Sequence, residues 1–144
     1  MPGEVRDPTG PNTAALVISA RGIPATDLNA LVGLEPDRSW DEDEPVGSTG
    51  RGRRQFTGWR IDASRGDETA DSRVRSLLHR VHDVAADIAR VARDPRIHSV
   101  SLWVWSEDPE FALNLPADLV MEIARLGASL KIKVYDVSTD GPQE

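Results

Sequence analysis

Residues 97–105 alternate between apolar and polar or aromatic side chains, a pattern that is typical of a half-buried β-strand. Apolar side chains occupy every second position, and polar or aromatic side chains occupy the positions between them. The apolar set is Val100, Leu102 and Val104, and the other set is Ser99, Ser101, Trp103 and Trp105. Similar alternation predicts strands at 14–20, 56–62 and 129–137. Strands with one apolar and one mixed face favour a largely antiparallel sheet that helices cover on one side only.

Helical spacing of apolar residues predicts the covering layer. The clearest helix is expected from about residue 71 to residue 93, with Thr69 or Asp71 as its N-cap and Asp94-Pro95 as its end. Two shorter helices are expected at 24–33 and 116–126, and a further short strand at 111–115.

The predicted order of elements is β-α-β-α-β-β-α-β, which indicates a two-layer α+β fold. From the second strand onward this order is that of a ferredoxin-like core, which the extra N-terminal strand–helix pair extends. A chain of 144 residues fits a single domain. We expect a flexible N-terminal segment (1–13), one α+β domain (14–137) with a long loop at 35–55, and a flexible tail (138–144).

Composition restricts the chemistry and the location. The chain has no cysteine, which excludes disulfides, thiolate catalysis and cysteine-based metal sites. No apolar stretch approaches the roughly 20 residues that span a bilayer, and the N-terminal segment lacks the apolar core of a signal peptide. We therefore expect a cytoplasmic protein that does not enter a membrane.

The charge balance bears on partners. The formal net charge is −7, which disfavours binding to duplex nucleic acid because phosphates repel an acidic surface. Such a charge suits a basic protein partner, and it equally suits plain solubility.

Short motifs along the chain resemble a bacterial family catalogued as domain of unknown function 4279. The resemblance covers residues 14–137. Its features are the turn Leu31–Pro36, a glycine-containing loop (Gly47, Gly50), a strand with Trp59, the long central helix, and a last helix that ends at Leu126-Gly127 before the strand 130–135. The family has no agreed activity, so the resemblance implies no catalytic residues. Some members of such small bacterial families look like antitoxin-type immunity proteins.

One group of aromatic and basic residues is the main candidate for a binding site. If the strands pair as expected, most of the group shares the face opposite the core, and Trp59 is an additional candidate through the alternation of its own strand. Clustered aromatic and cationic side chains often mark a contact surface. The alternative is that the long loop or a second copy covers them as a secondary core. The candidates are Trp59, Trp103, Trp105, Lys131, Lys133 and Tyr135.

Three other motifs are weak as metal or anion sites. His79 and His82 lie three residues apart on the long helix, but the sequence names no third ligand, and His98 carries no signal. The acidic run Asp41–Glu44 lacks the spacing of a calcium loop and is expected to be a solvated loop. The run Gly47–Arg54 lacks the lysine–hydroxyl ending of a phosphate-binding loop, so we interpret it as a flexible basic loop that could still dock on an acidic partner.

The sequence offers no motif for catalysis or RNA recognition. There is no nucleophile elbow and no cysteine, so we predict no catalytic residue and no cofactor. An open sheet with aromatic and basic residues is also used to bind single-stranded RNA, but the glycine–aromatic signature of that fold is missing and the chain is acidic. Nucleic acid is therefore an unfavoured partner.

These observations favour a non-catalytic binding module that contacts a protein through its aromatic open face, with an immunity-type inhibitor as one form of it. A second hypothesis is a homodimeric structural or small-ligand-binding domain in which two open faces pack together. A third is a small hydrolase that uses carboxylates or histidines.

Overall fold

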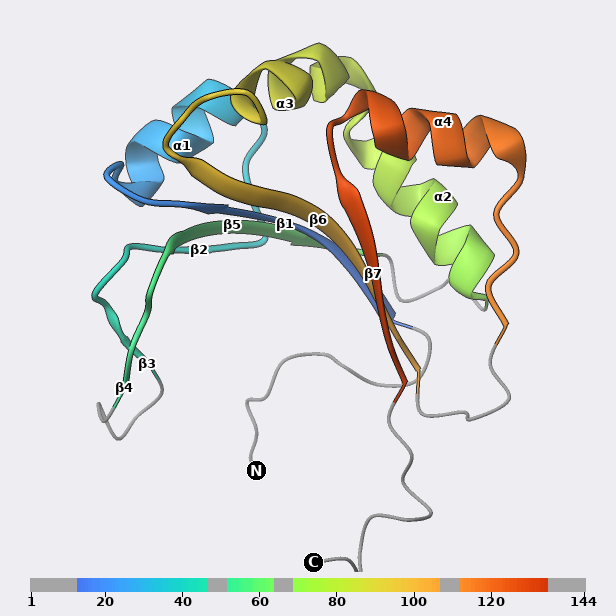
Figure 1. Cartoon of the computed structure of the whole chain (residues 1–144), viewed down its shortest axis with the longest axis horizontal. Coiled ribbons are helices and arrows are strands. Elements are labelled where there is room, and N and C mark those ends of the chain that lie inside the picture. The colour runs from blue at the N-terminus through green and yellow to red at the C-terminus, as the bar shows by residue number, and fades with distance from the viewer. Residues whose placement is uncertain (1–12, 47–51, 64–68, 107–111, 135–144) are drawn as a thin grey trace, which may run out of the picture.

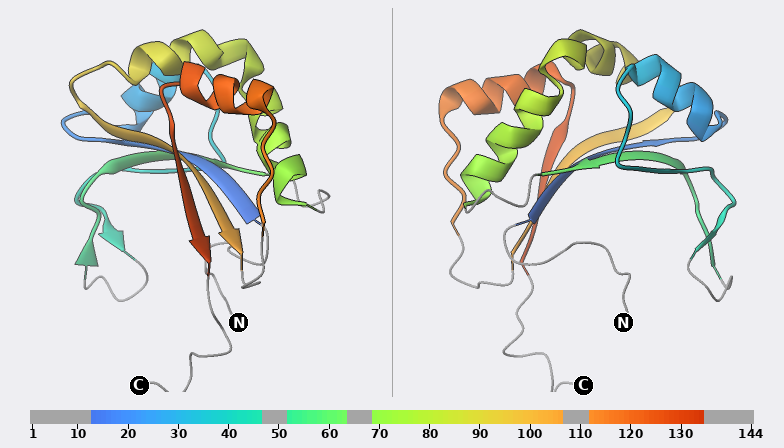
Figure 2. Two further views of the ribbon diagram at one scale, coloured as in Figure 1. Left: turned by 45° about the vertical axis from the view of Figure 1, so that its right-hand side comes forward. Right: turned by 180° about the vertical axis from the view of Figure 1, so that it is seen from behind.

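A curved β-sheet with helices along one side forms the body of the chain (Figure 1). The structure is a computed structural model that describes residues 13–46, 52–63, 69–106 and 112–134. All helices lie on the same side of the sheet (Figure 2). The predicted α+β class with helices on one face is confirmed.

The main sheet has five strands in the order β2-β5-β1-β6-β7. Only the β6–β7 pair is parallel, whereas the other pairs are antiparallel, which confirms a largely antiparallel sheet. A separate two-stranded hairpin consists of β3 and β4. The strands are β1 (Thr13–Ala20), β2 (Arg38–Trp40), β3 (Pro45–Val46), β4 (Gly52–Arg53), β5 (Thr57–Asp62), β6 (Ile97–Ser106) and β7 (Ser129–Val134).

The position of β1 in the sheet differs from the prediction that this strand extends a ferredoxin-like core. It pairs with β5 on one side and β6 on the other, so it lies at the centre of the sheet. The predicted ferredoxin-like arrangement is therefore not confirmed. The described part of the predicted strand 111–115 has no regular structure, although Leu113 and Leu115 pack against the core. A parallel crossover through a helix joins β6 to β7 and requires no additional strand.

The helical layer contains one break that the apolar spacing did not indicate. The predicted helix at 71–93 is divided at Val81, whose backbone (φ −100°, ψ 5°) leaves the helical region. This division lets the second half pack against α1 while the first half packs against β1. The expected cap is present, because the Thr69 side chain accepts a hydrogen bond from the Ser72 N–H at 3.1 Å. The helical elements are α1 (Ala25–Val32), α2 (Ala70–Arg80), η1 (His82–Val84), α3 (Ala85–Val91) and α4 (Ala117–Arg125).

The hydrophobic core fills the space between the sheet and the helices. The apolar positions that alternate along β1 and β6 point into it, as predicted. Trp59 is fully buried there, and its indole N–H donates a hydrogen bond to the Leu34 carbonyl at 3.1 Å. Other fully buried side chains include Leu16, Ile18, Leu28, Leu77 and Leu102.

The segment at 35–55 is more ordered than a single long loop, because its described part contains β2 and the β3–β4 hairpin. Most of the acidic run is exposed, as predicted, but two of its carboxylates also accept hydrogen bonds from the backbone. Asp41 accepts a hydrogen bond from the Ala25 N–H at 2.7 Å, and Glu42 accepts one from the Gly22 N–H at 2.7 Å. Asp41 thus satisfies a backbone donor in the first turn of α1, where negative charge is stabilising, and Glu42 satisfies one in the turn that precedes the helix.

The predicted flexible ends lie outside the described residues, apart from Thr13, which begins β1. Within the described ranges, none of the helices has the length and apolar character needed to cross a bilayer.

Candidate functional site

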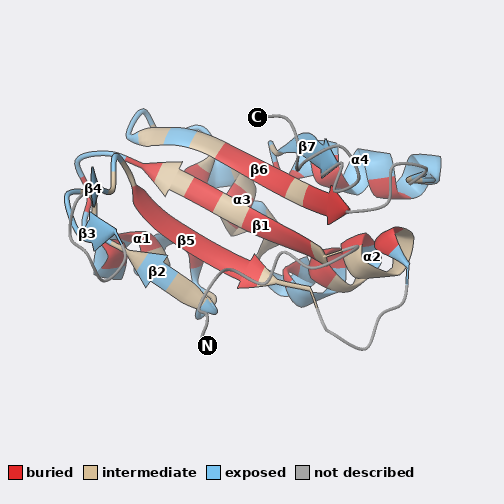
Figure 3. Cartoon of the chain, turned by 90° about the horizontal axis from the view of Figure 1, so that it is seen from below, coloured by how far each residue is buried: buried red, intermediate tan, exposed pale blue. Residues whose placement is uncertain are grey.

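We call the side of the sheet that faces away from the helices the open face; none of the helices in the described ranges lies over it (Figure 3). The strand register fixes which side chains share it. Val17 of β1 lies opposite Arg60 of β5 on one side and opposite Ser101 of β6 on the other. Because register partners point to the same side of a sheet, these three residues define the open face at its centre.

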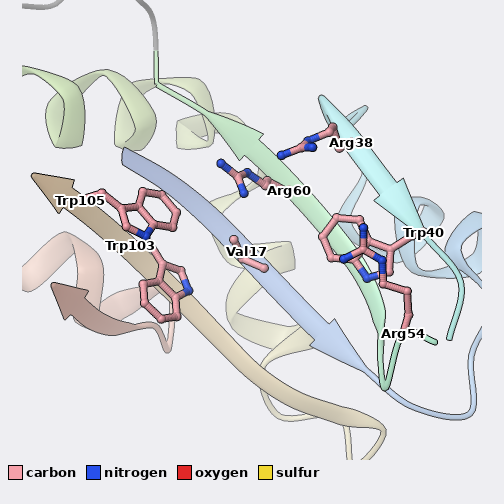
Figure 4. Close-up of a pocket in the computed structure, with 7 residues that line it drawn as sticks. All are labelled: Val17, Arg38, Trp40, Arg54, Arg60, Trp103 and Trp105. Carbon is pink, nitrogen blue, oxygen red and sulfur yellow. The ribbon is translucent and has the colours of Figure 1, made fainter. Parts of the chain in front are cut away.

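A hollow of about 230 Å³ lies in the open face. In Figure 4, Val17 lies between a pair of tryptophans on β6 and a tryptophan–arginine pair on the opposite side, with two further arginines on β2 and β5. We call this feature the Trp–Arg hollow. Its lining residues are Val17, Arg38, Trp40, Arg54, Arg60, Trp103 and Trp105.

The β6 side of the hollow is a row of stacked aromatic and cationic groups. Trp103 and Trp105 are two residues apart on one strand, and their rings stack with centroids 5.5 Å apart and planes 6° apart. The Lys131 ammonium lies 5.6 Å from the centroid of Trp103, and the Arg60 guanidinium lies 5.3 Å from that of Trp105. Both distances are within the range of cation–π attraction.

The opposite side of the hollow depends on a glycine. Trp40 and Gly58 are register partners on β2 and β5. A Cβ atom on Gly58 would lie 2.1 Å from the Trp40 ring, so the indole rests against the bare backbone of β5. The Arg54 guanidinium lies over this ring, 4.5 Å from its centroid.

Positive charge is concentrated around the hollow. Arg38 and Arg60 lie directly opposite each other on neighbouring strands, an arrangement of like charges that raises the free energy of a sheet. Asp62 offsets part of this charge, because its Oδ1 lies 2.8 Å from both Nε and Nη2 of Arg60. None of the described residues that line the hollow is acidic. With Lys131 and Lys133 beside it, the open face is cationic on a chain whose net charge is −7.

An ion pair at the start of β2 positions this side of the hollow. The Arg80 guanidinium on α2 lies 2.8 Å from Oδ2 of Asp37, and the same oxygen accepts a hydrogen bond from the Asp62 N–H at 2.7 Å. The hydrogen bond from Arg80 lowers the pKa of Asp37 below its ordinary value. Asp37 therefore ties β2, which carries Arg38 and Trp40, to both α2 and β5.

The sequence-predicted site residues fall into three groups. Trp103, Trp105, Lys131 and Lys133 lie on the open face as expected, with Lys131 opposite Trp103 and Lys133 opposite Trp105. Tyr135 lies outside the described residues.

Trp59 does not lie on the open face, so that part of the prediction was wrong. Its register partner is Ile18, a core residue, and none of its surface is exposed. Trp59 alternates with Arg60 and shares its face with Thr57 and Ile61, and this face is the buried one.

Five of the seven lining residues were not among the predicted site residues, namely Val17, Arg38, Trp40, Arg54 and Arg60. The alternation of β5 held a usable signal for one of them, because Arg60 stands between two core residues and must point to the other side. No comparable signal marked β2, which is three residues long and lies between a proline-containing turn and the acidic run.

The described ranges contain no cluster of three or more histidine, cysteine or acidic side chains that could hold a metal ion. His79 lies at the end of α2 and His82 in η1, both exposed. His98 instead stacks on Phe56 with centroids 4.4 Å apart.

The fold and the open face together define a two-layer α+β domain with a cationic, tryptophan-rich sheet surface. The family described as a domain of unknown function (DUF4279) matches residues 10–137, and the chain belongs to that family, which confirms the resemblance seen in the sequence. No curated protein and no solved structure matches the chain.

Proposed function

We propose that this chain is a non-catalytic protein-binding module and that its open face is the contact surface. The observation that carries the proposal is the Trp–Arg hollow, in which three tryptophans and three arginines from β2, β5, β6 and the residue after β4 surround one depression. Tryptophan and arginine are the residue types most enriched among those that dominate protein–protein binding energy.

The partial exposure of two of the three tryptophans supports a contact surface rather than a secondary core, whereas Trp105 beside them is only 8% exposed. Trp40 and Trp103 are partly exposed. Indole rings have few rotatable bonds, so they bury a large area on binding at a small entropic cost. The β-strands beneath them give a rigid platform that needs little rearrangement.

The size of the hollow favours a side chain of a partner over a whole small ligand. Drug-sized ligands occupy clefts of about 300–1,000 Å³, whereas this hollow measures about 230 Å³. It suits one or two side chains of a larger molecule that also rests on the surrounding sheet.

Charge argues against a homodimer in which two open faces pack together. Such packing would bring Arg38, Arg60 and Lys131 of one copy close to the same cationic groups of the other, and like charges in contact at an interface are unfavourable. A partner with a complementary acidic surface avoids this repulsion.

Quantitative affinity capture tests the proposal. The tagged chain, a Trp40→Ala/Trp103→Ala variant and a control variant would be incubated with lysate of the native host, and captured proteins would be quantified by mass spectrometry. The control is Val120→Ala/Met121→Ala, which alters residues of α4 that are 50% and 54% exposed on the helical side. We expect a stoichiometric protein that the wild type and the control retain and the open-face variant loses. Equal capture by the open-face variant would contradict the proposal.

The bacterial origin, the cytoplasmic location and the role as an immunity-type inhibitor stay predictions. The same capture experiment bears on the last of these, because an inhibitor of this type would retain an enzyme or a toxin in equal amount.

A further inference from the structure

Building on the proposed function, we infer that the Trp–Arg hollow recognises a carboxylate: an acidic side chain of the partner, next to an aromatic side chain that rests on Val17 between the tryptophans. The ligand class is thus an acidic peptide segment with an aromatic residue.

The guanidinium groups provide the anion recognition. Arg38 on β2, Arg54 after β4 and Arg60 on β5 all line the same depression. A guanidinium presents parallel N–H donors whose geometry matches the two oxygens of a carboxylate. The Arg60 side chain is only 7% exposed, and charge-assisted hydrogen bonds are stronger where water is largely excluded.

Arg60 of the hollow already pairs with a carboxylate of the chain itself, that of Asp62 two residues along β5. The Oδ1 atom of Asp62 accepts a hydrogen bond from Nε of Arg60 at 2.8 Å, and Nη2 of the same guanidinium lies 2.8 Å from that oxygen as an ion pair. Arg38 lies directly opposite Arg60 across the strand pair, so two guanidinium groups carry like charge at adjacent positions of the open face. A carboxylate from a partner would reduce the repulsion between these like charges, so the site is poised to favour an anion.

The aromatic side chains determine what must accompany the carboxylate. The stacked Trp103–Trp105 pair and Trp40 lie on opposite sides of Val17 (Figure 4). A flat apolar group fits between indole rings in offset-stacked or edge-to-face contact. A long polyanion such as nucleic acid is disfavoured by the net charge of −7, whereas a short acidic segment presents its charge only at the hollow.

Tryptophan indole signals in a ¹H–¹⁵N spectrum give a direct test with a built-in control. The chain has four tryptophans, of which Trp40, Trp103 and Trp105 line the hollow. The fourth, Trp59, has its N–H bonded to the Leu34 carbonyl inside the core. The probe is a capped hexapeptide with one phenylalanine flanked by glutamates, and the comparison peptide carries glutamine in place of glutamate.

We expect the acidic peptide to shift the three hollow signals saturably and to leave the Trp59 signal in place, with the glutamine peptide binding at least about tenfold more weakly. Equal affinity of the two peptides would overturn the inference, as would the absence of saturable binding at millimolar peptide. Tighter binding of inorganic phosphate or adenosine monophosphate than of the acidic peptide would also overturn it and assign the hollow to phosphate.

Matched arginine variants separate specific recognition from general charge. Arg38→Met and Arg54→Met should each weaken the acidic peptide roughly tenfold, since each removes a charged hydrogen-bond donor. Arg75→Met, on the exposed side of α2, removes the same charge far from the hollow and should leave the affinity unchanged. An equal loss in the Arg75→Met variant would show that overall charge, and not the hollow, governs binding.

The failure of this inference and that of the proposed function are distinguishable. If Arg38→Met retains the captured partner while Trp40→Ala/Trp103→Ala loses it, the open face is a binding surface that does not recognise a carboxylate. If the tryptophan variant retains the partner, the proposed function itself is wrong.

Discussion

Gly58 shows how one residue without a side chain shapes the candidate site. The Trp40 ring covers the backbone of β5 at this position, where any Cβ atom would overlap the indole. An aromatic side chain laid across a glycine on the neighbouring strand is a known way of stabilising such a glycine. The position of Trp40, and with it that of Arg54, depends on Gly58.

We predict that Gly58→Ala displaces Trp40 and lowers the free energy of unfolding by about 1–2 kcal/mol, as overpacking typically does. The Trp40 indole signal should move in a ¹H–¹⁵N spectrum, and binding at the open face should weaken. Gly52→Ala is the control, because its Cβ atom would meet Val46 at 4.0 Å, an ordinary contact. An unmoved Trp40 signal in Gly58→Ala would refute this account of the site.

At the residue scale, the sequence predicted which side chains share a face but not which face is buried in every strand. The alternation of β6 correctly placed Trp103 and Trp105 on the open side. In β5 the same reasoning made Trp59 an additional candidate for the open face, although this side chain is fully buried in the core. Tryptophan occurs in cores and on contact surfaces alike, so the burial of Trp59 followed from its pairing with Ile18, which a single sequence does not display.

At the scale of elements, the short strand β2 is held by side-chain contacts as well as by its pairing with β5. It has three residues and lies at the edge of the sheet, so its own ladder contributes few hydrogen bonds. Asp37 reinforces it through Arg80 and through the Asp62 N–H.

We predict that Asp37→Asn lowers the free energy of unfolding at pH 7 by about 1 kcal/mol, a modest value because the ion pair is partly exposed. The pKa of Asp37 is lowered from its ordinary 3.8, so its contribution is complete above that pH and is lost as the pH falls through the folded-state value. Urea unfolding at a series of pH values should show the difference between wild type and variant shrinking below about pH 4. Glu35→Gln, an exposed neighbouring acid, is the control. A difference that grows on acidification would have the wrong sign for this account.

The edge strand β7 combines an exposed ladder with two lysines. All six of its residues are exposed, and Leu130, Ile132 and Val134 form an apolar stripe on the side opposite Lys131 and Lys133. Charged side chains on an edge, lysine above all, hinder pairing with another copy.

Replacing both lysines should therefore promote self-association. We predict that Lys131→Val/Lys133→Val shifts the chain toward larger species in sedimentation velocity relative to the wild type, and that Lys131→Arg/Lys133→Arg does not, since it keeps the charge. Unchanged sedimentation of the valine variant would mean that the lysines do not protect this edge.

At the element scale, the sequence predicted the long, strongly patterned segments best. The strands at 14–20 and 97–105 and the start of the central helix lie where their periodicity placed them. The break at Val81 depends on how the helices follow the curved sheet. The central place of β1 depends on pairing between strands that are distant in the sequence. Neither cause leaves a pattern in the local sequence. The two-residue strands β3 and β4 are too short to show alternation.

The charge of the whole molecule is distributed unevenly. The net charge is −7, while the open face gathers Arg38, Arg54, Arg60, Lys131 and Lys133. At physiological ionic strength, screening limits electrostatic attraction to about 8 Å. An acidic partner is therefore attracted at contact with the open face rather than from a distance, and wrong orientations are repelled by the rest of the surface.

The dissociation constant of the captured partner is the measurement that tests the central claim most directly. It would be determined by calorimetry for the wild type, for Trp40→Ala/Trp103→Ala, and for the α4 control Val120→Ala/Met121→Ala. If the open face is the binding surface, the tryptophan variant binds at least about a hundredfold more weakly, since two central aromatic residues are removed, and the control binds like the wild type. Wild-type affinity in the tryptophan variant, with its fold intact by circular dichroism, would contradict the account.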